Sequence, residues 1–519
     1  MLDCTLRDGG YINDWKFGYN AIKGIIRKLE RTGIEMIEVG FIKGEQYDID
    51  STLFPLIEDF KNVIENKVPG VMYVGMIDMN NPVPIEKISP YDGLSIDAIR
   101  VIFKKNRITE ALDYCQKIIE LGYKCFVNLV NSDLYSDVEF VETISLFNEI
   151  NPTALSIVDT FGVIKKKQFC RLVSLADNNL KEGIMLCYHA HNNLQQALLN
   201  AEAMVEMNLQ RDIVIDACVF GMGRGAGNLN LEVIADYLNE NCDTSYCIDP
   251  ILEIMDEYLV SFYRKKFWGY SMPLYLSALL NCHPNYAIYY AEKNCLTEKS
   301  FSGLLSSIAT QDKSIFSKER ADYYYKQYFC SEIDDSDDIN ELKRLLAGKQ
   351  ILLLCPGKNL NTYDKEIRKF IDENTIVISV NFYDRKWNPK YVISTNSRRF
   401  AKLFDMGVND RIIATSNVYG YRNAKYVIDF NNFSGNHDDI DNNGGIIAIR
   451  FLHFLGVKNL MIAGMDGYSN ENAGNYYIDG FESERNSIFN NRNNQVQGEL
   501  DQLKKMVNIV FVTPSIYSC

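Results

Sequence analysis

The stretch that decides the fold is Leu2–Gly10, LDCTLRDGG, in which a short apolar run ends on an arginine, an aspartate and two glycines. A second informative stretch lies far downstream at His189–Asn193, HAHNN. Both stretches fall at the ends of predicted strands. Residues two apart on a strand point to the same side, so the rings of His189 and His191 lie together. With Asp8, these two histidines predict a site for a divalent cation.

Arg7 beside this site could hold a carboxylate or an enolate oxygen of a substrate. The alternative is that Arg7 and Asp8 only pair with each other and that the histidines are ordinary strand-end residues. The combination of all four groups favours the metal site.

Apolar runs alternate with amphipathic segments over the first part of the chain. The runs predict eight strands, at Leu2–Leu6, Met36–Gly40, Val71–Met76, Ala98–Phe103, Cys125–Val130, Ala154–Asp159, Ile184–Ala190 and Ile213–Val219. Eight strands that alternate with helices predict a (β/α)8 TIM barrel. An open doubly wound sheet is the alternative, but no Gly-rich dinucleotide loop follows the first strand.

Active-site residues of a barrel lie at the C-terminal ends of its strands. The polar residues at the predicted strand ends are Arg7, Asp8, Glu38, Asp159, His189 and His191, and the loop Gly221–Asn228 follows the eighth strand. All of these groups therefore fall on one face of the predicted barrel, which supports both the fold and the site.

The rest of the chain predicts further parts beyond a catalytic barrel domain at 1–245. Residues 246–330 are rich in Tyr, Leu and Phe, and we expect a helical extension or lid. The acidic run that follows predicts a linker at 331–348. A new α/β pattern at 349–519 predicts seven strands and a Rossmann-like three-layer α/β/α domain.

Four sequence blocks resemble the DRE-TIM metallolyase family, which contains pyruvate aldolases, hydroxymethylglutaryl-CoA lyases, and isopropylmalate and homocitrate synthases. The blocks are Thr5–Gly9, Ile37–Gly40, His189–Asn192 and Gly221–Asn228. The resemblance implies that Asp8, His189 and His191 bind a divalent metal ion, with Asn228 as a possible fourth ligand. Oxygen and nitrogen ligands favour Mn²⁺ or Mg²⁺, and Co²⁺ or Zn²⁺ stay open. The ion would chelate a 2-oxo acid, and Arg7 would add a second positive charge.

The resemblance also indicates a branch of the family and roles for other residues. The short Gly221–Asn228 loop resembles the pyruvate aldolases and lacks the cysteine of the lyases. Glu38 either pairs with Arg7 as a buried carboxylate or takes part in proton transfer. Asp159 and Thr160 could organise hydrogen bonds behind the metal ligands.

One departure concerns the catalytic base. The pyruvate aldolases carry a histidine shortly after the Arg-Asp pair, where this chain has Gly10 and Tyr11. Tyr11 is the natural substitute, although its ordinary pKa of about 10 makes it a poor base. His283 in the helical segment could supply the base instead, or it could be a packing residue.

The C-terminal domain carries weaker motifs. Pro356–Asn359, between a predicted strand and a helix, could bind phosphate or form only a tight turn. Three further blocks are Val380–Phe382, Ser394–Arg399, and Asn442–Gly445 leading to Ala463–Tyr468. With these blocks, the domain resembles bacterial sialyltransferases that use CMP-sugars and related flagellin-glycosylation accessory proteins. The residues that would contact nucleotide or phosphate are Gly357, Asn381, Asn396, Asn443, Gly444 and Gly445. No histidine follows Gly467, where the sialyltransferases have their base, so this domain could bind a nucleotide-sugar without transferring it.

The amino-acid composition limits which kinds of partner and cellular compartment are expected for this chain. Hydrophobic residues make up 47% and charged residues 24% of the 519, as in globular proteins with an ample core. The net charge of −14 argues against nucleic-acid and anionic-membrane partners. The 13 cysteines include no paired CxxC motifs, which favours reduced thiols. No apolar run is long enough to span a bilayer, and we expect a cytoplasmic protein that forms a homo-oligomer, as barrels of this family often form dimers.

The favoured hypothesis is a metal-dependent aldolase that joins or splits pyruvate, or a close 2-oxo acid, and an aldehyde. The pairing with a nucleotide-sugar domain suggests synthesis of a surface-polysaccharide sugar. One alternative is a Claisen-type synthase that uses acyl-CoA. Another is a glycosyltransferase whose activity resides in the C-terminal domain, with the barrel as a scaffold. A carboxyltransferase is less favoured because no biotin-carrier motif is visible.

Overall fold

The chain folds into two compact units, Met1–Ile288 and Tyr289–Cys519. This computed structural model describes residues 1–44, 46–293, 296–329, 333–434, 443–468, 476–477 and 489–518. The boundary between the units falls inside the predicted helical extension, within α12 (Pro284–Glu292).

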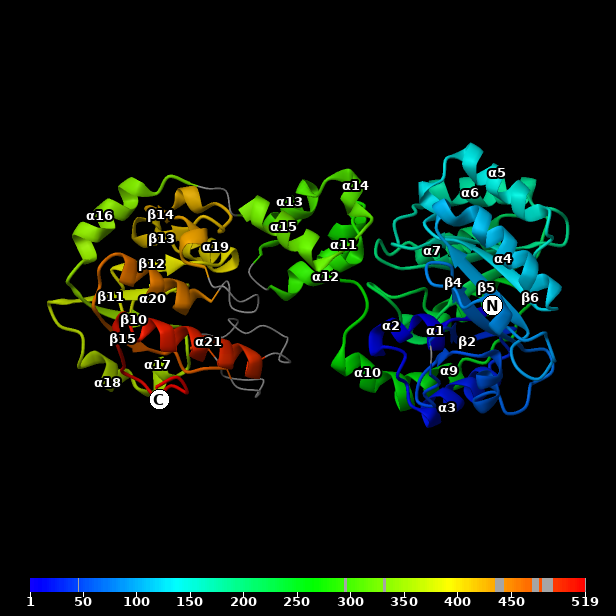
Figure 1. The fold of residues 1–519 in the computed structure, drawn as a ribbon, viewed down its shortest axis with the longest axis horizontal. Coiled ribbons are helices and arrows are strands. Elements are labelled where there is room, and N and C mark those ends of the chain that lie inside the picture. The colour runs from blue at the N-terminus through cyan, green and yellow to red at the C-terminus, as the bar shows by residue number, and fades with distance from the viewer. Residues whose placement is uncertain are drawn as a thin grey trace. The chain divides into compact units, whose positions relative to one another are not determined.

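Eight parallel strands form a closed barrel in the first unit, which confirms the barrel prediction (Figure 1). They are β1 (Leu2–Asp3), β2 (Met36–Ile42), β4 (Met72–Asp78), β5 (Ala98–Phe103), β6 (Lys124–Leu129), β7 (Ala154–Asp159), β8 (Met185–Ala190) and β9 (Ile213–Ala217). The barrel closes because β1 pairs with both β2 and β9. A short strand, β3 (Leu53–Phe54), pairs with the far end of β2.

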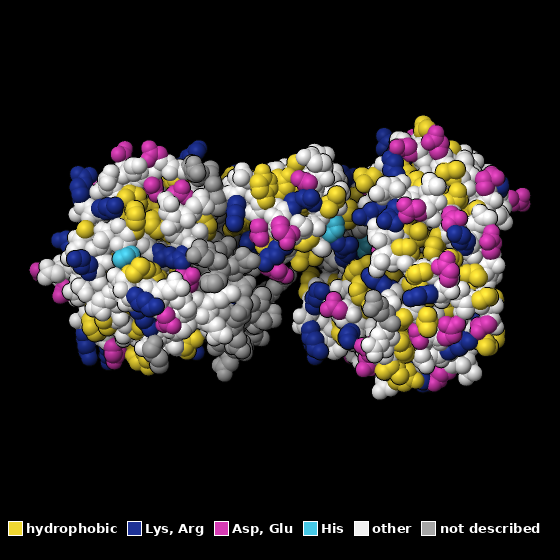
Figure 2. Space-filling model, in the orientation of Figure 1, with side chains coloured by type: hydrophobic (Ala, Val, Ile, Leu, Met, Phe, Trp, Pro, Cys, Tyr) yellow, Lys and Arg dark blue, Asp and Glu magenta, His cyan; other side chains and the backbone are white. Residues whose placement is uncertain are grey.

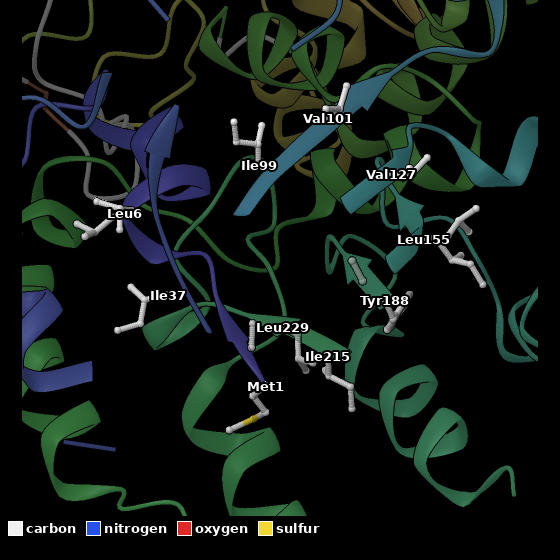
Figure 3. Packing of buried hydrophobic residues seen from close by; sticks show 14 of the residues in the cluster. Met1, Leu6, Ile37, Ile99, Val101, Val127, Leu155, Tyr188, Ile215 and Leu229 are labelled. Carbon is white, nitrogen blue, oxygen red and sulfur yellow. The ribbon is translucent and has the colours of Figure 1, made fainter. Parts of the chain in front are cut away.

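Helices cover the outside of the barrel. They are α3 (Tyr19–Leu29), α4 (Ile108–Glu120), α5 (Asp137–Asn148), α6 (Lys166–Asn179), α7 (Ala197–Glu206) and α8 (Leu231–Asn241). In α3 the buried residues Ile22, Ile25, Ile26 and Leu29 recur at helical spacing. Figure 3 shows side chains of this outer core, among them Ile37 on β2, Ile99 on β5, Val127 on β6 and Leu155 on β7.

The strand alternation places polar groups inside one end of the barrel. The inner apolar core includes Met36, Ala98, Cys187 and Val214. Two residues further along the same strands, the same face carries Glu38, Arg100, His189 and Asp216, all buried. The C-terminal end of the barrel interior is therefore charged, whereas the N-terminal end is apolar.

The chain between the last barrel strand and the first strand of the second sheet is mainly helical. They include α9 (Asp249–Ile254), α10 (Val260–Lys265), α11 (Met272–Leu279), α13 (Glu298–Ser307), α15 (Lys318–Phe329) and α16 (Ser336–Leu346). The helix α16 lies within the predicted linker, and its Ile339, Leu342 and Leu346 are buried in the core of the second unit.

The second unit contains a parallel sheet with the order β14-β13-β12-β11-β10-β15-β16. These strands are β10 (Gln350–Leu354), β11 (Thr375–Val380), β12 (Tyr391–Ser394), β13 (Ile412–Thr415), β14 (Tyr426–Ile428), β15 (Asn459–Ala463) and β16 (Asn508–Phe511). Residues of α16 and α20 (Gly444–Phe454) pack on one face. Residues of α17 (Asn359–Thr362), α18 (Asp364–Arg368) and α19 (Ser397–Asp405) pack on the other. The order of the strands reverses at β10, so a crevice is expected beside its carboxyl end.

The surface charges and the free cysteines are those expected of a globular protein with reduced thiols. Acidic and basic side chains are interspersed on the face seen in Figure 2. The ten cysteines in the described part of the chain are all free. Among the helices described here, none combines the length and apolar character needed to cross a membrane.

Candidate active site

Asp8, His189 and His191 form a buried cluster at the C-terminal end of the barrel. The Nε2 atoms of both histidines lie 3.8 Å from Oδ2 of Asp8. These separations exceed a hydrogen bond, but two ligands of one ion at about 2.0–2.2 Å each can span them. Three groups that converge in this way can hold a divalent cation.

The backbone after β1 determines where Asp8 lies. Residues Thr5–Asp8 form a single helical turn, α1, rather than the end of the predicted strand Leu2–Leu6. The Thr5 hydroxyl donates to the Asp3 carboxylate and accepts the N–H of Val219. This bond ties the turn to the end of β9, close to the loop that carries Asn228.

Asn228 supports the fit of a metal ion to this cluster. Its amide Nδ2 donates to Oδ2 of Asp8, and its Oδ1 is buried without a hydrogen-bond partner among the described residues. Rotation of the amide by 180° brings Oδ1 toward Asp8, as a shared ion would require. The unsatisfied oxygen and the donor types of the cluster therefore fit a divalent cation.

The protonation states also suit metal binding. Burial lowers the pKa of His191 to about 4, so the ring is neutral at pH 7. Burial alone would raise the pKa of Asp8, but the adjacent Arg7 guanidinium and the histidines outweigh it and hold that pKa below its usual range. The cluster thus offers a carboxylate and a neutral imidazole at neutral pH.

Arg7 is fixed beside the cluster by two carboxylates. Its Nη1 donates to Asp8 Oδ1 at 2.6 Å and its Nε donates to Glu38 Oε2 at 2.7 Å. The Phe41 ring centroid lies 5.7 Å from the guanidinium carbon. Of the two roles considered for Glu38, the structure shows the ion pair with Arg7.

Asp216 and Arg100, which belong to none of the sequence motifs, complete the network. The Asp216 carboxylate lies 3.0 Å from Nδ1 of His189 and pairs with the Arg100 guanidinium. Arg100 also lies 3.4 Å from Glu38. In the sequence, the only sign of either residue is its charge at an inward-facing position of an otherwise apolar strand. Asp216 fixes the tautomer and orientation of His189, so that Nε2 faces Asp8.

The charges in this network do not balance. The carboxylates of Asp8, Glu38 and Asp216 face the guanidiniums of Arg7 and Arg100, so three negative charges oppose two positive ones. All five groups are buried. A buried excess negative charge is costly without a counter-ion, and a divalent cation supplies one.

Asp159 and Thr160 lie at the end of β7, outside the cluster. The Asp159 carboxylate accepts the N–H groups of Val163 and Ile164, and the Thr160 hydroxyl accepts the N–H of Asn131. The Asp159 carbonyl accepts the N–H of His191. These residues support the loop and the strand that present the second histidine.

Tyr11 and His283 lie around Arg224, a residue of the loop after β9. The Arg224 guanidinium carbon lies 5.7 Å from the Tyr11 ring centroid, and Nη2 lies 2.9 Å from His283 Nε2. Burial, and next the Asp8 charge, raise the pKa of Tyr11. Burial and the Arg224 charge lower the pKa of His283 to about 3. At neutral pH, Tyr11 is therefore a protonated phenol and His283 a neutral ring.

A separate cavity of about 220 Å³ lies in the second unit, where the strand order reverses beside β10. Its wall contains all six residues predicted to contact nucleotide or phosphate, namely Gly357, Asn381, Asn396, Asn443, Gly444 and Gly445. Asn443 caps α20 by accepting the N–H of Ile446. Lys293, Arg399 and Arg492 also line the cavity. The start of a helix and these three cations favour an anion, and the carboxylate of Asp466 also lines the cavity.

Comparisons with known proteins match the barrel. The HMGL-like family model matches residues 94–255. The 4-hydroxy-2-oxovalerate aldolase of Chloroflexus aurantiacus is 24% identical over 246 residues, which span 46% of this chain and 68% of the relative. The oxaloacetate decarboxylase of Mycobacterium tuberculosis is 22% identical over 242 residues, which span 45% and 68%.

A solved structure is also similar to part of this chain. It is the N-terminal domain of a proposed aldolase from Bacteroides vulgatus, with 23% identity and a TM-score of 0.48. The match covers 56% of this chain and 95% of that one.

The matched family is one of lyases and aldolases, and the related proteins include several 4-hydroxy-2-oxovalerate aldolases. The chain is therefore an enzyme whose barrel is similar to those of lyases and aldolases and carries a possible metal site.

Proposed function

We propose that the barrel is a divalent-metal-dependent aldolase that joins or splits pyruvate, or a close 2-oxo acid, and an aldehyde. The observation that carries the proposal is the buried cluster of Asp8, His189 and His191 with Arg7 fixed beside it. These three ligands and Asn228 would hold Mn²⁺ or Mg²⁺, because the set has oxygen and nitrogen donors and no thiolate. When bound, the ion polarises the keto group of the 2-oxo acid and makes the adjacent C–H more acidic.

Arg7 supplies the second positive charge at the same substrate oxygens. Its Nε and Nη1 are engaged by Glu38 and Asp8, which leaves Nη2 to donate to a carboxylate or keto oxygen. Two ion pairs and the Phe41 ring hold the guanidinium plane in place, so little reorganisation is needed when charge develops on that oxygen.

Tyr11 is the proton donor in this proposal. In the synthetic direction, C3 of pyruvate loses a proton to a water molecule, a bond forms to the aldehyde carbon, and the aldehyde oxygen gains the Tyr11 proton. The Tyr11 phenolate then regains a proton from water, so no net proton is gained or lost. A phenol with a raised pKa keeps its proton at neutral pH and can give it to a strongly basic alkoxide. Tyr11 lies within electrostatic reach of Asp8 and Arg7, the groups that flank the reacting oxygens.

Condensation of ¹³C-labelled pyruvate with a panel of aldehydes, followed by NMR, tests this proposal. The expected result is a product with a new bond at C3 that forms with Mn²⁺ or Mg²⁺ and not with EDTA. Release of thiol from acetyl-CoA in the presence of a 2-oxo acid, with no aldehyde product, would establish the Claisen synthase instead.

We infer a second function for the C-terminal unit, the binding of a nucleotide or nucleotide-sugar. The observation that favours it is the cavity beside β10, the position at which open parallel sheets bind ligands. Gly444 and Gly445 begin α20, so their N–H groups can meet a phosphate there. Together the two units would serve synthesis of a surface-polysaccharide sugar.

Calorimetric titration of the full chain with CMP, CMP-linked sugar and UDP-linked sugar tests this second function. Binding of at least one of them, lost when Asn443 is changed to Ala, is expected. If none binds, the polysaccharide role is refuted while the aldolase proposal stands.

A further inference from the structure

Arg224 occupies an unusual electrostatic position at the mouth of the barrel. It belongs to the Gly221–Asn228 loop, four residues before the candidate ligand Asn228. Gly225 and Gly227 in this loop have positive φ values of 66° and 78°, which glycine adopts without strain. A Cβ added at the neighbouring Gly223 would clash with Nδ2 of Asn228, so the loop brings the backbone beside Arg224 close to this candidate ligand.

The contacts of Arg224 are all with neutral groups. Nη2 lies 2.9 Å from His283 Nε2 and 3.3 Å from Asn285 Oδ1, and the guanidinium carbon lies over the Tyr11 ring. Within the described ranges, no carboxylate lies within 4 Å of this guanidinium. The buried arginines of the same unit differ, since Arg7 and Arg100 each pair with two carboxylates.

A partly buried guanidinium without a carboxylate partner is ready for an external anion. Such a cation has lost part of its hydration, and a bidentate carboxylate or phosphate restores the missing interactions. The guanidinium of Arg224 lies over the ring of Tyr11, three residues after the candidate ligand Asp8. An anion on Arg224 would thus lie beside the metal cluster.

The charge balance of the site also favours the binding of an external anion at Arg224. The cluster carries three carboxylates and two guanidiniums, so a divalent ion brings its net charge from −1 to +1. The carboxylate of a 2-oxo acid then neutralises it. Arg224 adds one further positive charge, which a second anionic group would offset together with Asp78, whose charge also acts on Tyr11.

We propose that Arg224 binds an anionic substituent of the aldehyde substrate, a carboxylate or a phosphate, and thereby selects anionic over neutral aldehydes. This inference rests on the aldolase function proposed above. Arg224 is a specificity-determining residue, with His283 and Asn285 orienting its guanidinium.

Matched pairs of aldehydes test the proposal in the full-length protein. One pair is D-glyceraldehyde and D-glyceraldehyde 3-phosphate, and the other is propionaldehyde and succinic semialdehyde. The wild type is expected to favour the charged member of at least one pair by about tenfold or more in kcat/KM, and the pair concerned identifies phosphate or carboxylate. Arg224→Gln should reduce that preference by about tenfold, whereas Arg224→Lys should retain part of it.

Arg27→Gln is the matched control. Arg27 is an exposed arginine near the C-terminal end of α3 that pairs with Glu65, and its removal should leave the preference intact. Equal kcat/KM for both members of both pairs, or an unchanged preference in Arg224→Gln, would overturn the role of Arg224. Absence of any condensation together with absence of metal-dependent proton exchange on pyruvate would instead refute the aldolase function itself.

Discussion

Replacement of Asp216 by asparagine tests whether the buried network tunes the metal site. The Asp216 carboxylate lies 3.0 Å from Nδ1 of His189 and pairs with Arg100. An amide of nearly the same shape keeps one acceptor but removes the negative charge, so His189 becomes a weaker ligand. The net charge of the cluster changes from −1 to 0, which further reduces its attraction for a cation.

Carboxylates that support a ligating histidine are typically worth about 10–100-fold in metal affinity. The expected loss for Asp216→Asn is therefore about 1.4–2.7 kcal/mol of binding free energy. Titration of Mn²⁺ followed by electron paramagnetic resonance measures it, because the signal of free aqueous Mn²⁺ is lost on binding. Circular dichroism would establish that the variant is folded before the titration.

The matched control for this change is Asp177→Asn. Asp177 is also a buried partner of an arginine, accepting from Arg211 Nε at 2.8 Å, but it has no contact with the metal cluster. Its Mn²⁺ affinity should equal that of the wild type. A folded Asp216→Asn variant that binds Mn²⁺ as tightly as Asp177→Asn would refute the reasoning.

Two further predictions concern the barrel core and the second unit. Burial raises the pKa of Asp3 from 3.8 to about 7, so the folded state binds its proton more tightly than the unfolded state, and the free energy of unfolding should fall as pH rises from about 4 to 7. In Asp3→Asn, the free energy of unfolding from urea titrations should differ less between pH 5 and pH 8 than in the wild type. An equal difference in the wild type and the variant would contradict this prediction. Gly444→Ala should weaken nucleotide binding by about tenfold, because the added Cβ would lie 2.6 Å from Asn381 Nδ2. Gly498→Ala, where the Cβ meets open space on a helix, should bind normally in the same calorimetric titration, and a similar loss in both variants would exclude a local effect.

The strand pattern was predictable because it depends on local apolar periodicity. All eight barrel strands lie at or within a few residues of the predicted runs, and the second sheet has the predicted seven strands. The main difference is at the first strand, where Thr5–Asp8 turn into a helix. There the Cys4 carbonyl accepts the N–H groups of both Arg7 and Asp8, a local arrangement that apolar spacing does not reveal.

Part of the site depends on contacts that no sequence pattern encodes. Arg100 and Asp216 are 116 positions apart and meet only when the barrel closes. The Arg224 contact with His283 depends on how the helices after the barrel return to its mouth. The acidic residues of the predicted linker include the start of α16, where Asp337 and Asp338 favour the helix N-terminus.

In the proposed aldolase, Asp8, His189 and His191 hold an ion that activates pyruvate. Solvent deuterium exchange into the methyl group of pyruvate, followed by NMR, tests this role without knowledge of the aldehyde. Exchange is expected with Mn²⁺ or Mg²⁺, but not with EDTA and not in His189→Ala. Exchange that persists in EDTA or in His189→Ala, or its absence with every metal tested, would contradict this role.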